Sequence, residues 1–420
     1  MQKSKLNNLN TGNNKMKIQL RKTALSLAVI AGIGASGVAS ANSLTATIKG
    51  TVVGPNGNPD KSSVITIIHE PTGSKKTLSL TENGVFNASG LRVGGPYTLV
   101  VDSQVHRDKT LSDLYLTLGK TSSLDIELNS NVERITVTGA SRHSIMNASK
   151  DTIGSVYGAG DIEKAPSFDR DLKDIIRQNP LVNISDDSRG EMSVGGVNPR
   201  FNSISIDGVK QNDDFGLNDN GYPTNGSPVS LLAIDQVSVD ITPFNAKASG
   251  FTGASVNAVT KSGTNEFSGE FFYEYEDDSL AGTPKREDGT EVELDYERKT
   301  FGASLGGKII EDELFFFVAY EESTTPFVNN WGVQGSGAAN ELDWITNSDI
   351  QEIQDIAKNQ YGVNTGNTPS GLNNDSEKLL LKLDWNINDY HRAAFTYQDS
   401  TDNSITPQNT RFDRFSLLSN

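Results

Sequence analysis

The stretch from residue 190 to residue 262 constrains this fold more than any other, because it cannot form a core by itself. Two short β-rich runs, residues 203–206 and 236–239, are bracketed by turn-forming residues. The segments between and after them are polar and rich in Gly, Asn and Ser. A segment of this composition must therefore be covered by other parts of the chain.

This stretch resembles the plug domain of TonB-dependent outer-membrane receptors. Residues 204–209, Ile-Ser-Ile-Asp-Gly-Val, are similar to the apolar strand and Asp-Gly turn of that family, and residues 234–239 and 253–261 are similar to its last plug strands. An Ile-Asp-Gly-Val turn alone fits any β-rich domain, so the resemblance rests on the order of the motifs. The matched plug positions are Gly195, Gly196, Arg200, Asp207, Gly208 and Gly253.

One departure from the family pattern follows the Val-x-Val strand. Many members carry Arg-Gly-Pro there, whereas this chain has Asp-Ile-Thr-Pro-Phe at residues 240–244. The departure indicates a large-plug, Oar-like subgroup, and it prevents a transfer of individual ligand contacts. We expect the ligand contacts in the polar loop from residue 210 to 228, where Asp213, Asp214 and Asp219 form either a calcium site or a solvated acidic loop. The spacing of an EF-hand is missing, which favours the solvated loop.

Composition excludes several classes of function. At 420 residues the chain is long enough for several domains. Its net charge is −16, and the first 41 residues contain only basic charges, so the remainder is still more acidic. Nucleic acid is therefore not an expected partner. Because there is no Cys, disulfides, thiolate metal sites and Cys nucleophiles are all excluded.

The first 41 residues have the layout of a secretory signal peptide. A basic region (15–22) precedes an apolar stretch of small residues (23–38), and Ala39 and Ala41 form a small-x-small cleavage site. The apolar stretch is too short for a membrane-spanning helix, which needs about 20 residues. Translation can begin at Met1 or at Met16.

Residues 43–128 predict a small β-sandwich. Short alternating runs recur at the spacing of such a fold, with turns such as Gly-Pro-Asn-Gly between them. The segment resembles carboxypeptidase-regulatory-like domains, which often precede plugs of this family. His69 and His106 stand alone, without the His/Glu spacing of a zinc site, so we expect no metal and no cofactor. The expected strands are 45–53, 64–69, 76–80, 85–88, 97–102 and 122–128.

A linker, residues 129–142, contains a strand-like run that resembles a TonB box. Its β-branched residues alternate, as in a free strand that pairs with the edge of a partner's sheet. The alternatives are an edge strand of the sandwich itself or an extended linker. The residues matched to the box are Glu133, Arg134, Ile135, Thr136, Val137, Thr138 and Gly139.

The remaining plug, residues 143–263, begins with a predicted amphipathic helix. From 167 to 179 the apolar residues Phe168, Leu172, Ile175 and Ile176 recur at helical spacing, and Asn-Pro ends the helix. This pattern places Lys173 on the solvent side.

After residue 264 the pattern becomes that of long β-strands. Aromatic and polar residues alternate in 267–276, and similar runs follow at 298–309, 314–322, 377–388 and 390–399. Turns at 311–313 and 388–389 are tight, whereas 277–296 and 323–376 are long polar loops, the asymmetry typical of outer-membrane barrels. A soluble antiparallel sheet is the alternative. The second loop contains a predicted helix, 349–361, with Ser348 and Gln351 as its capping box and Gly362 as its end.

The predicted fold is therefore mainly β: an N-terminal β-sandwich, an α+β plug and the first strands of an antiparallel transmembrane β-barrel (264–420). Five strands do not close a barrel of the plugged type, which uses about 22 strands, so we expect the N-terminal fragment of a longer receptor or a truncated gene product. The resemblance implies uptake of a still unidentified ligand across the outer membrane. Its expected partners are a TonB-type inner-membrane energising complex and outer-membrane lipid.

Two other classes of function were weighed. A surface adhesion or assembly protein would use the same sandwich and loops without transport. An enzyme is not expected, because four scattered His, no Cys and no Gly-x-Ser-x-Gly elbow leave no catalytic constellation.

Overall fold

The structure is a computed structural model, and the residues it describes all lie in one compact unit, Ala41–Asn420. The predicted signal peptide, including Ala39 and Ala41, and the TonB-box-like residues 133–139 lie outside the described residues. The described residues are 44–129, 147–148, 153–167, 170–185, 190–241, 251–280, 282, 285, 289, 291, 297–327, 331–336, 338, 340–366, 372–389 and 391–403.

The N-terminal domain is a sandwich of two four-stranded sheets. Its strands alternate between buried apolar and exposed polar residues, so each sheet turns one apolar face to the other. The shared core includes Ile48, Ile65, Phe86, Leu99 and Leu124. One sheet has the order β4 (Val85–Leu91), β1 (Ala46–Val53), β7 (Thr121–Glu127), β8 (Asn147–Ala148); the other has the order β3 (Ser74–Ser79), β2 (Val64–His69), β5 (Gly94–Asp102), β6 (Lys109–Leu116), with the 3-10 turn η2 (Glu70–Thr72) after β2.

All six strands predicted for the sandwich are present, with ends that shift by a few residues. Strand β6 was not predicted. Its first half is polar, and Asp113 interrupts it with a φ of 58°, so the alternation is visible only from Leu114 onward. Its strand conformation follows from pairing with β5, which its own sequence pattern does not show.

The plug is built on a five-stranded mixed sheet. Its central strands carry mostly small and β-branched residues and are buried nearly throughout, as in a sheet covered on both faces. The sheet order is β13 (Val209–Lys210), β12 (Ser203–Ile206), β15 (Ala254–Thr260), β14 (Ile234–Ile241), β9 (Ile153–Gly158), and the accompanying elements are α1 (Ala159–Lys164), α2 (Leu172–Ile176), the hairpin β10 (Val182–Ile184) and β11 (Met192–Val194), and the 3-10 turns η3 (Pro199–Phe201) and η4 (Leu231–Ala233).

The predicted plug helix exists but is shorter than expected. It begins at Leu172, because Asp171 caps it by accepting a hydrogen bond from the Lys173 amide (2.8 Å) and Arg170 has a φ of 51°. Leu172, Ile175 and Ile176 are buried as predicted. The prediction for Lys173 was wrong, because its side chain is buried.

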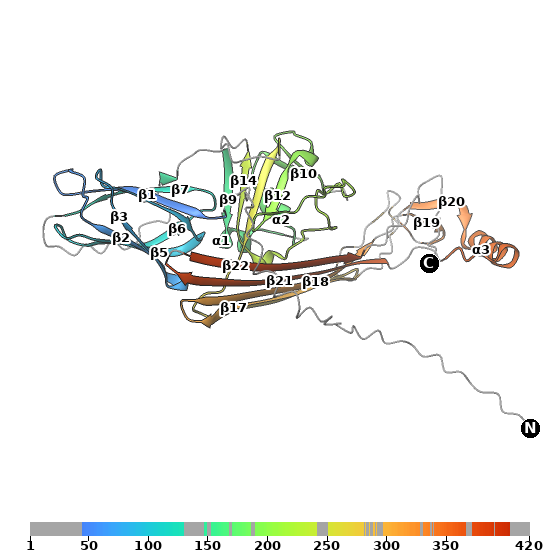
Figure 1. The fold of residues 1–420 in the computed structure, drawn as a ribbon. Coiled ribbons are helices and arrows are strands. Elements are labelled where there is room, and N and C mark those ends of the chain that lie inside the picture. The colour runs from blue at the N-terminus through green and yellow to red at the C-terminus, as the bar shows by residue number, and fades with distance from the viewer. Residues whose placement is uncertain are drawn as a thin grey trace, which may run out of the picture. The chain divides into compact units, whose positions relative to one another are not determined.

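Five long antiparallel strands follow in chain order, and Figure 1 shows β17, β18, β21 and β22 side by side. β18 and β21 extend further than predicted, because their ladder continues through pairs such as Thr324 with Asp375. Strands β16 and β22 are the two edges, and no described residue pairs one with the other. The strands are β16 (Ser268–Asp277), β17 (Glu297–Ile310), β18 (Leu314–Phe327), β21 (Leu372–Asn388) and β22 (His391–Asn403).

The connection between β18 and β21 contains a small unit of its own. Two short strands, β19 (Trp331–Gln334) and β20 (Asn340–Thr346), precede the helix α3 (Asn347–Tyr361). Gly362 ends the helix as predicted, with a φ of 67°. The predicted capping box was wrong: Thr346 and Asp349 form it, because the helix starts earlier than its apolar pattern shows. No helix among the described residues is long and apolar enough to cross a membrane.

The two faces of the long-stranded sheet differ as the alternation predicted. Phe271, Tyr273 and Tyr275 are exposed on one face, and Leu381 and Leu383 follow the same pattern in β21. The intervening residues Leu380, Lys382 and Asp384 are buried on the other face. The buried face packs on the plug, since Phe317, Ala319 and Leu380 belong to the plug's apolar core.

The sandwich core contains only residues of the sandwich, so we expect a fragment of residues 44–129 to fold alone. Within it, Gly50 lies in the central strand β1, where an added Cβ would meet the Leu124 carbonyl and the Phe86 ring (2.7 Å). Gly50→Ala should lower the free energy of unfolding of the fragment by at least about 2 kcal/mol.

Urea denaturation followed by circular dichroism measures this change. Lys49→Ala, at the neighbouring exposed position, is the control and should alter the free energy of unfolding by less than about 0.5 kcal/mol. Equal effects of the two substitutions would show that β1 is not the packed centre of its sheet.

Candidate functional site

The predicted plug motif forms a tight hairpin at Asp207 and Gly208. Both residues have positive φ, 45° and 80°, between the paired residues Ile206 and Val209. A two-residue hairpin of this type needs positive φ at both central positions, which Asp-Gly supplies at low cost. The hairpin directs the Asp207 carboxylate at strand β15, where it accepts hydrogen bonds from the amide (2.9 Å) and hydroxyl (2.5 Å) of Thr260.

Asp207 also connects the plug to the long-stranded sheet. Lys382 of β21 is 7% exposed, and its Nζ lies 3.4 Å from the Asp207 carboxylate. The same ammonium group donates to the carbonyl (3.0 Å) and hydroxyl (2.9 Å) of Thr260. Because a buried ammonium is costly unless it is paired and hydrogen-bonded, Lys382 holds β21 against this point of the plug.

A second buried charge cluster lies further along the sheet. Glu321 of β18 is 1% exposed and accepts hydrogen bonds from Lys378 (3.0 Å) and from the plug residues Ser230 (2.6 Å) and Arg170 (3.3 Å). The Arg170 guanidinium also stacks 3.6 Å from the centroid of the Phe272 ring. Through Arg170 and Ser230 these contacts attach the plug to β18 and β16.

Sequence reasoning missed both clusters. Glu321, Lys378 and Lys382 interrupt strands at positions that point inward, where an apolar residue would be expected on a sheet covered by a core. This interruption is the signal that could have marked them. The plug partners of Glu321 and Lys382 are 91 or more positions away in any case, and one sequence does not show such pairings.

The other predicted plug residues are structural. Gly195 and Gly196 form the turn after β11, with φ values of 59° and 77°. Gly253 lies against the Asn202 side chain, whose Cγ would be 3.3 Å from an added Cβ. Asn202 joins two strands, since its amide group donates to the Met192 carbonyl (2.7 Å) and accepts from the Ala254 amide (2.9 Å). Arg200 is exposed, with its guanidinium near Gly216.

The loop from 210 to 228 is anchored at several points. Tyr222 is fully buried and donates to Asp171 (3.0 Å), and burial raises the pKa of its hydroxyl well above the usual value. Lys173 donates to the carbonyls of Gly190 (2.9 Å) and Asn220 (2.5 Å), and burial lowers its pKa. At the C-terminal end of β22, away from the tight turns, the Asn225 amide donates to Asp402 (2.8 Å). The loop is therefore a fixed part of the plug surface.

The acidic residues of this loop bond to the chain itself. Asp213 accepts from the Asn218 amide (2.7 Å), the largest of several backbone hydrogen bonds that lower the pKa of its carboxyl. Asp214 pairs with Lys210 on the surface (2.8 Å). Among the described residues no group of acidic or His side chains is arranged to hold a metal ion.

His69 lies at the end of β2 with its ring buried. Its Nδ1 is 2.7 Å from the Thr72 hydroxyl, and the ring packs 4.7 Å from that of Tyr97. Burial, with smaller effects from the charges of Arg92 and Arg392, lowers the pKa of His69 to about 3. His69 is therefore a neutral structural residue of the sandwich.

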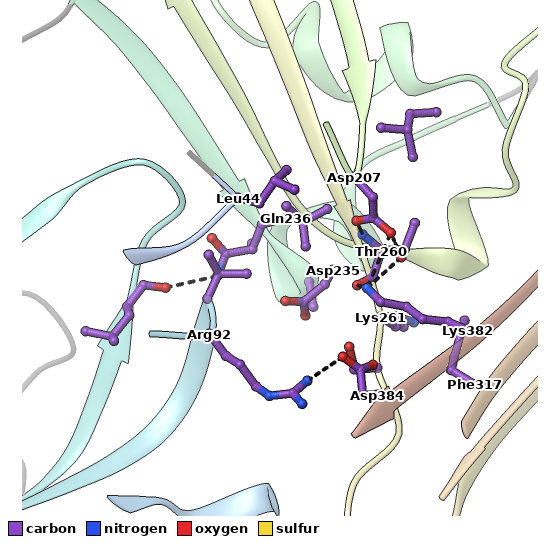
Figure 2. Close-up of a pocket in the computed structure, with 18 of the residues that line it drawn as sticks. Leu44, Arg92, Asp207, Asp235, Gln236, Thr260, Lys261, Phe317, Lys382 and Asp384 are labelled. Atoms are coloured by element: carbon purple, nitrogen blue, oxygen red, sulfur yellow. Dashed lines mark hydrogen bonds and ion pairs between the residues drawn. The ribbon is translucent and has the colours of Figure 1, made fainter. Parts of the chain in front are cut away.

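A cavity of about 1890 Å³ lies among the sandwich, the plug and the long-stranded sheet. Figure 2 shows Asp207, Thr260 and Lys382 grouped on one side of it, and Arg92 with Asp384 below. Asp235 of β14 lines it as well, partly buried. Burial raises the pKa of Asp235 to about 6, although the charges of Lys382 and Lys261 act in the opposite direction.

Three segments match family models. Residues 47–129 match the carboxypeptidase regulatory-like domain, residues 148–255 the TonB-dependent receptor plug domain, and residues 259–330 an outer membrane beta barrel domain. These are the domains of a TonB-dependent receptor. They confirm the resemblance found in the sequence and place the receptor in the outer membrane. They also assign the chain to receptors and not to enzymes.

Individual relatives are longer than this receptor chain. The TonB-dependent transporter Oar of Myxococcus xanthus is 27% identical over 323 residues, which cover 73% of this chain and 29% of Oar. The siderophore receptor PirA from Acinetobacter baumannii is 21% identical, with a TM-score of 0.39 and coverage of 60% and 32%. A mutant ferric enterobactin receptor, PfeA, from Pseudomonas aeruginosa is 20% identical, with a TM-score of 0.43 and coverage of 61% and 34%. The chain thus spans 29% to 34% of the length of these relatives.

The contacts of Asp207 lead to a test of the receptor's plug. Asp207→Asn keeps the turn, since Asn also tolerates positive φ, but it removes the charge that Lys382 faces. We expect the free energy of unfolding of the purified protein in detergent to fall by about 2 to 4 kcal/mol. Asp219→Asn, in the exposed loop, is the matched control and should change it by less than about 0.5 kcal/mol. A similar small effect at Asp207 would contradict the proposed anchoring.

The raised pKa of Asp235 predicts a pH dependence of stability. Between its unfolded value near 3.9 and its folded value of about 6, the folded protein binds more protons than the unfolded protein, so stability falls as pH rises through this window. Asp235→Asn should remove this fall and be more stable than the wild type at pH 7.5, by about 2 kcal/mol. Denaturation at pH 4.5 and pH 7.5 tests this. An unchanged pH dependence in the variant would show that Asp235 is not the responsible group.

Proposed function

We propose that this chain acts in active uptake of a ligand across the outer membrane, with energy transmitted from the inner membrane by a TonB-type complex. One observation carries the proposal: a plug domain is packed on the inward face of a barrel-type sheet and is attached there by buried charge pairs. Breaking these pairs would weaken the attachment of the plug, which also shares an apolar core with the sheet. Such weakening is what a gated transporter requires.

The proposed coupling segment is the TonB-box-like run of residues 133–139. On the N-terminal side of the run the chain comes from β7 of the sandwich. On its C-terminal side the chain passes through β8, which pairs with β7, and then continues to β9. Among the described residues β9 pairs only with β14, so it is an edge strand of the plug sheet. A partner that binds the run by strand addition and pulls on it would therefore load β8 first and β9 next. Because an edge strand has one neighbour, its removal breaks one ladder only.

The ligand-binding surface in this proposal is the loop from 210 to 228 with the neighbouring turn at Arg200. Phe215 and Leu217 are 87% and 83% exposed, which is unusual for large apolar side chains held in an anchored loop. The loop reaches Asp402 at the end of β22 that lies away from the tight turns. Long connections mark the outer side of barrels of this class, so the surface faces the side from which ligand arrives.

The predicted export signal, with cleavage after Ala41, and a periplasmic sandwich belong to the same proposal. The domain limits of 43–128, 129–142, 143–263 and 264–420 belong to it too. The short turns at 311–313 and 388–389 would then lie on the periplasmic side, next to the sandwich.

Replacing residues 133–139 in the full-length receptor by a Gly/Ser segment of equal length tests the coupling. Uptake should fall to the level of a strain without the receptor, because the partner loses its strand. Binding of ligand at the cell surface should be unchanged, because the plug and the loops are intact. Uptake of labelled ligand and binding to whole cells measure the two quantities.

Two outcomes would decide against the proposal. Unchanged uptake after the replacement would exclude residues 133–139 as the coupling segment. Full function in cells that lack the energising complex would favour the adhesion or assembly alternative.

A further inference from the structure

The sandwich joins the rest of the structure in a different way from the plug. The plug shares an apolar core with Phe317, Ala319 and Leu380 of the long-stranded sheet. The sandwich core contains residues of the sandwich alone. Its contacts with the plug and the sheet are hydrogen bonds, one ion pair, the short pairing of β7 with β8, and the approach of Leu44 to Gly208. Polar interfaces of this kind are typical of domains that separate and rejoin.

The first contact is made by Arg92, in the turn between β4 and β5. Its guanidinium donates to Asp384 (3.0 Å) and to Asn386 (3.2 Å) of β21. Both charged side chains are buried, with 9% and 5% of their surface exposed. The Arg92 Nε atom has no hydrogen-bond partner among the described residues. A buried pair with an unsatisfied donor gives up much of its attraction to desolvation, so this contact specifies a position more than it adds stability.

The second contact is made by Gln236, in plug strand β14. Its side-chain amide donates to the Leu116 carbonyl (3.2 Å) and accepts from the Leu118 amide (3.1 Å). The Gln236 side chain is buried, so both bonds are shielded from water. The end of β6 in the sandwich is thereby tied to a strand in the middle of the plug sheet.

The third contact lies at the tight turn between β17 and β18. The Asn265 amide donates to the Pro71 carbonyl of the sandwich (2.8 Å). The Asn265 side chain in turn donates to the Asp312 carboxylate (2.7 Å) and accepts from the Asp312 amide (2.9 Å). Pro71, Arg92, Gln236 and Asp384 all line the cavity, so the contacts surround it, as Figure 2 shows for the last three.

We propose that the sandwich is a detachable cap, docked at rest on the tight-turn end of the plug and the sheet by these three contacts. While it is docked, β14 cannot shift without breaking both bonds of Gln236, so the cap holds the plug in place. Lifting the cap opens the cavity. The claim that the cap lifts during energised uptake rests on the proposed function. The docking itself does not rest on it.

A disulfide between Gly73 and Asp312 would trap the docked state. An ideal Cβ on Gly73 lies 2.5 Å from the Asp312 Cγ, which leaves the two Cβ atoms close enough for a disulfide, whose span is about 3.5–4.5 Å. The chain has no Cys of its own, so Gly73→Cys with Asp312→Cys forms only this pair. In purified full chain in detergent, oxidation should cross-link most molecules.

Release variants test the first two contacts. When Arg92→Met and Gln236→Leu are added to the double-Cys variant, cross-linking should be at least fivefold slower, because the docked state becomes less populated. Lys49→Ala, on the exposed face of β1, is the control and should leave the rate unchanged. Equal rates in the release variant and the parent would overturn the cap.

A second measurement covers misfolding of the Cys variant, since Gly73 has a φ of 61° that Cys disfavours. Hydrogen exchange of the Leu118 amide needs no Cys. It should be at least tenfold faster in Gln236→Leu than in the wild type, while the amides of β2 keep their protection. An unchanged rate at Leu118 would also overturn the cap.

The link to uptake is tested separately in cells that express the full-length receptor. Cross-linking should be slower with an intact proton gradient than after addition of a protonophore. If the rate depends on Arg92 and Gln236 but not on the gradient, the docked cap stands and its energised release is wrong.

Discussion

Buried charge on the inward face of the long-stranded sheet is the constraint on which the rest of the structure depends. Glu321, Lys378, Lys382 and Asp384 all point to that face and are nearly inaccessible to solvent. A sheet cannot hide these groups unless partners satisfy them, because an unpaired buried charge costs several kcal/mol. The plug supplies Asp207, Thr260, Ser230 and Arg170, and the sandwich supplies Arg92. The charges therefore specify where the plug must lie on the long-stranded sheet.

Two kinds of interface result from this arrangement. Plug and sheet are joined by a common apolar core as well as by charge pairs, so their separation costs both hydrophobic burial and ion pairing. The sandwich shares no apolar core with the other two parts among the described residues; hydrogen bonds and one ion pair join it to them, and Leu44 lies against Gly208. The order in which the parts can move is thus set by chemistry: the sandwich separates more readily than the plug.

Much of the fold could be predicted from the sequence, because local patterns determine it. Alternation marked the sandwich strands and the five long strands, and Asp207-Gly208 marked the hairpin. Family motifs identified the plug before any contact was known. The predictions that failed concern features that depend on contacts between residues far apart in the sequence. Lys173 is buried because the carbonyls of Gly190 and Asn220 surround its ammonium group, and β6 is ordered by its neighbour β5. Arg92, Arg170 and Glu321 acquire their roles only when chain segments meet.

The most direct test of this account is a double-mutant cycle between Arg170 of the plug and Glu321 of the long-stranded sheet. The quantity measured is the free energy of unfolding of the purified protein in detergent. Arg170→Met and Glu321→Gln should each be destabilising, and the double variant should lose less than the sum of the two, with a coupling energy of at least about 1 kcal/mol. Additivity within about 0.5 kcal/mol would contradict the claim that buried charge pairs hold the plug on the sheet.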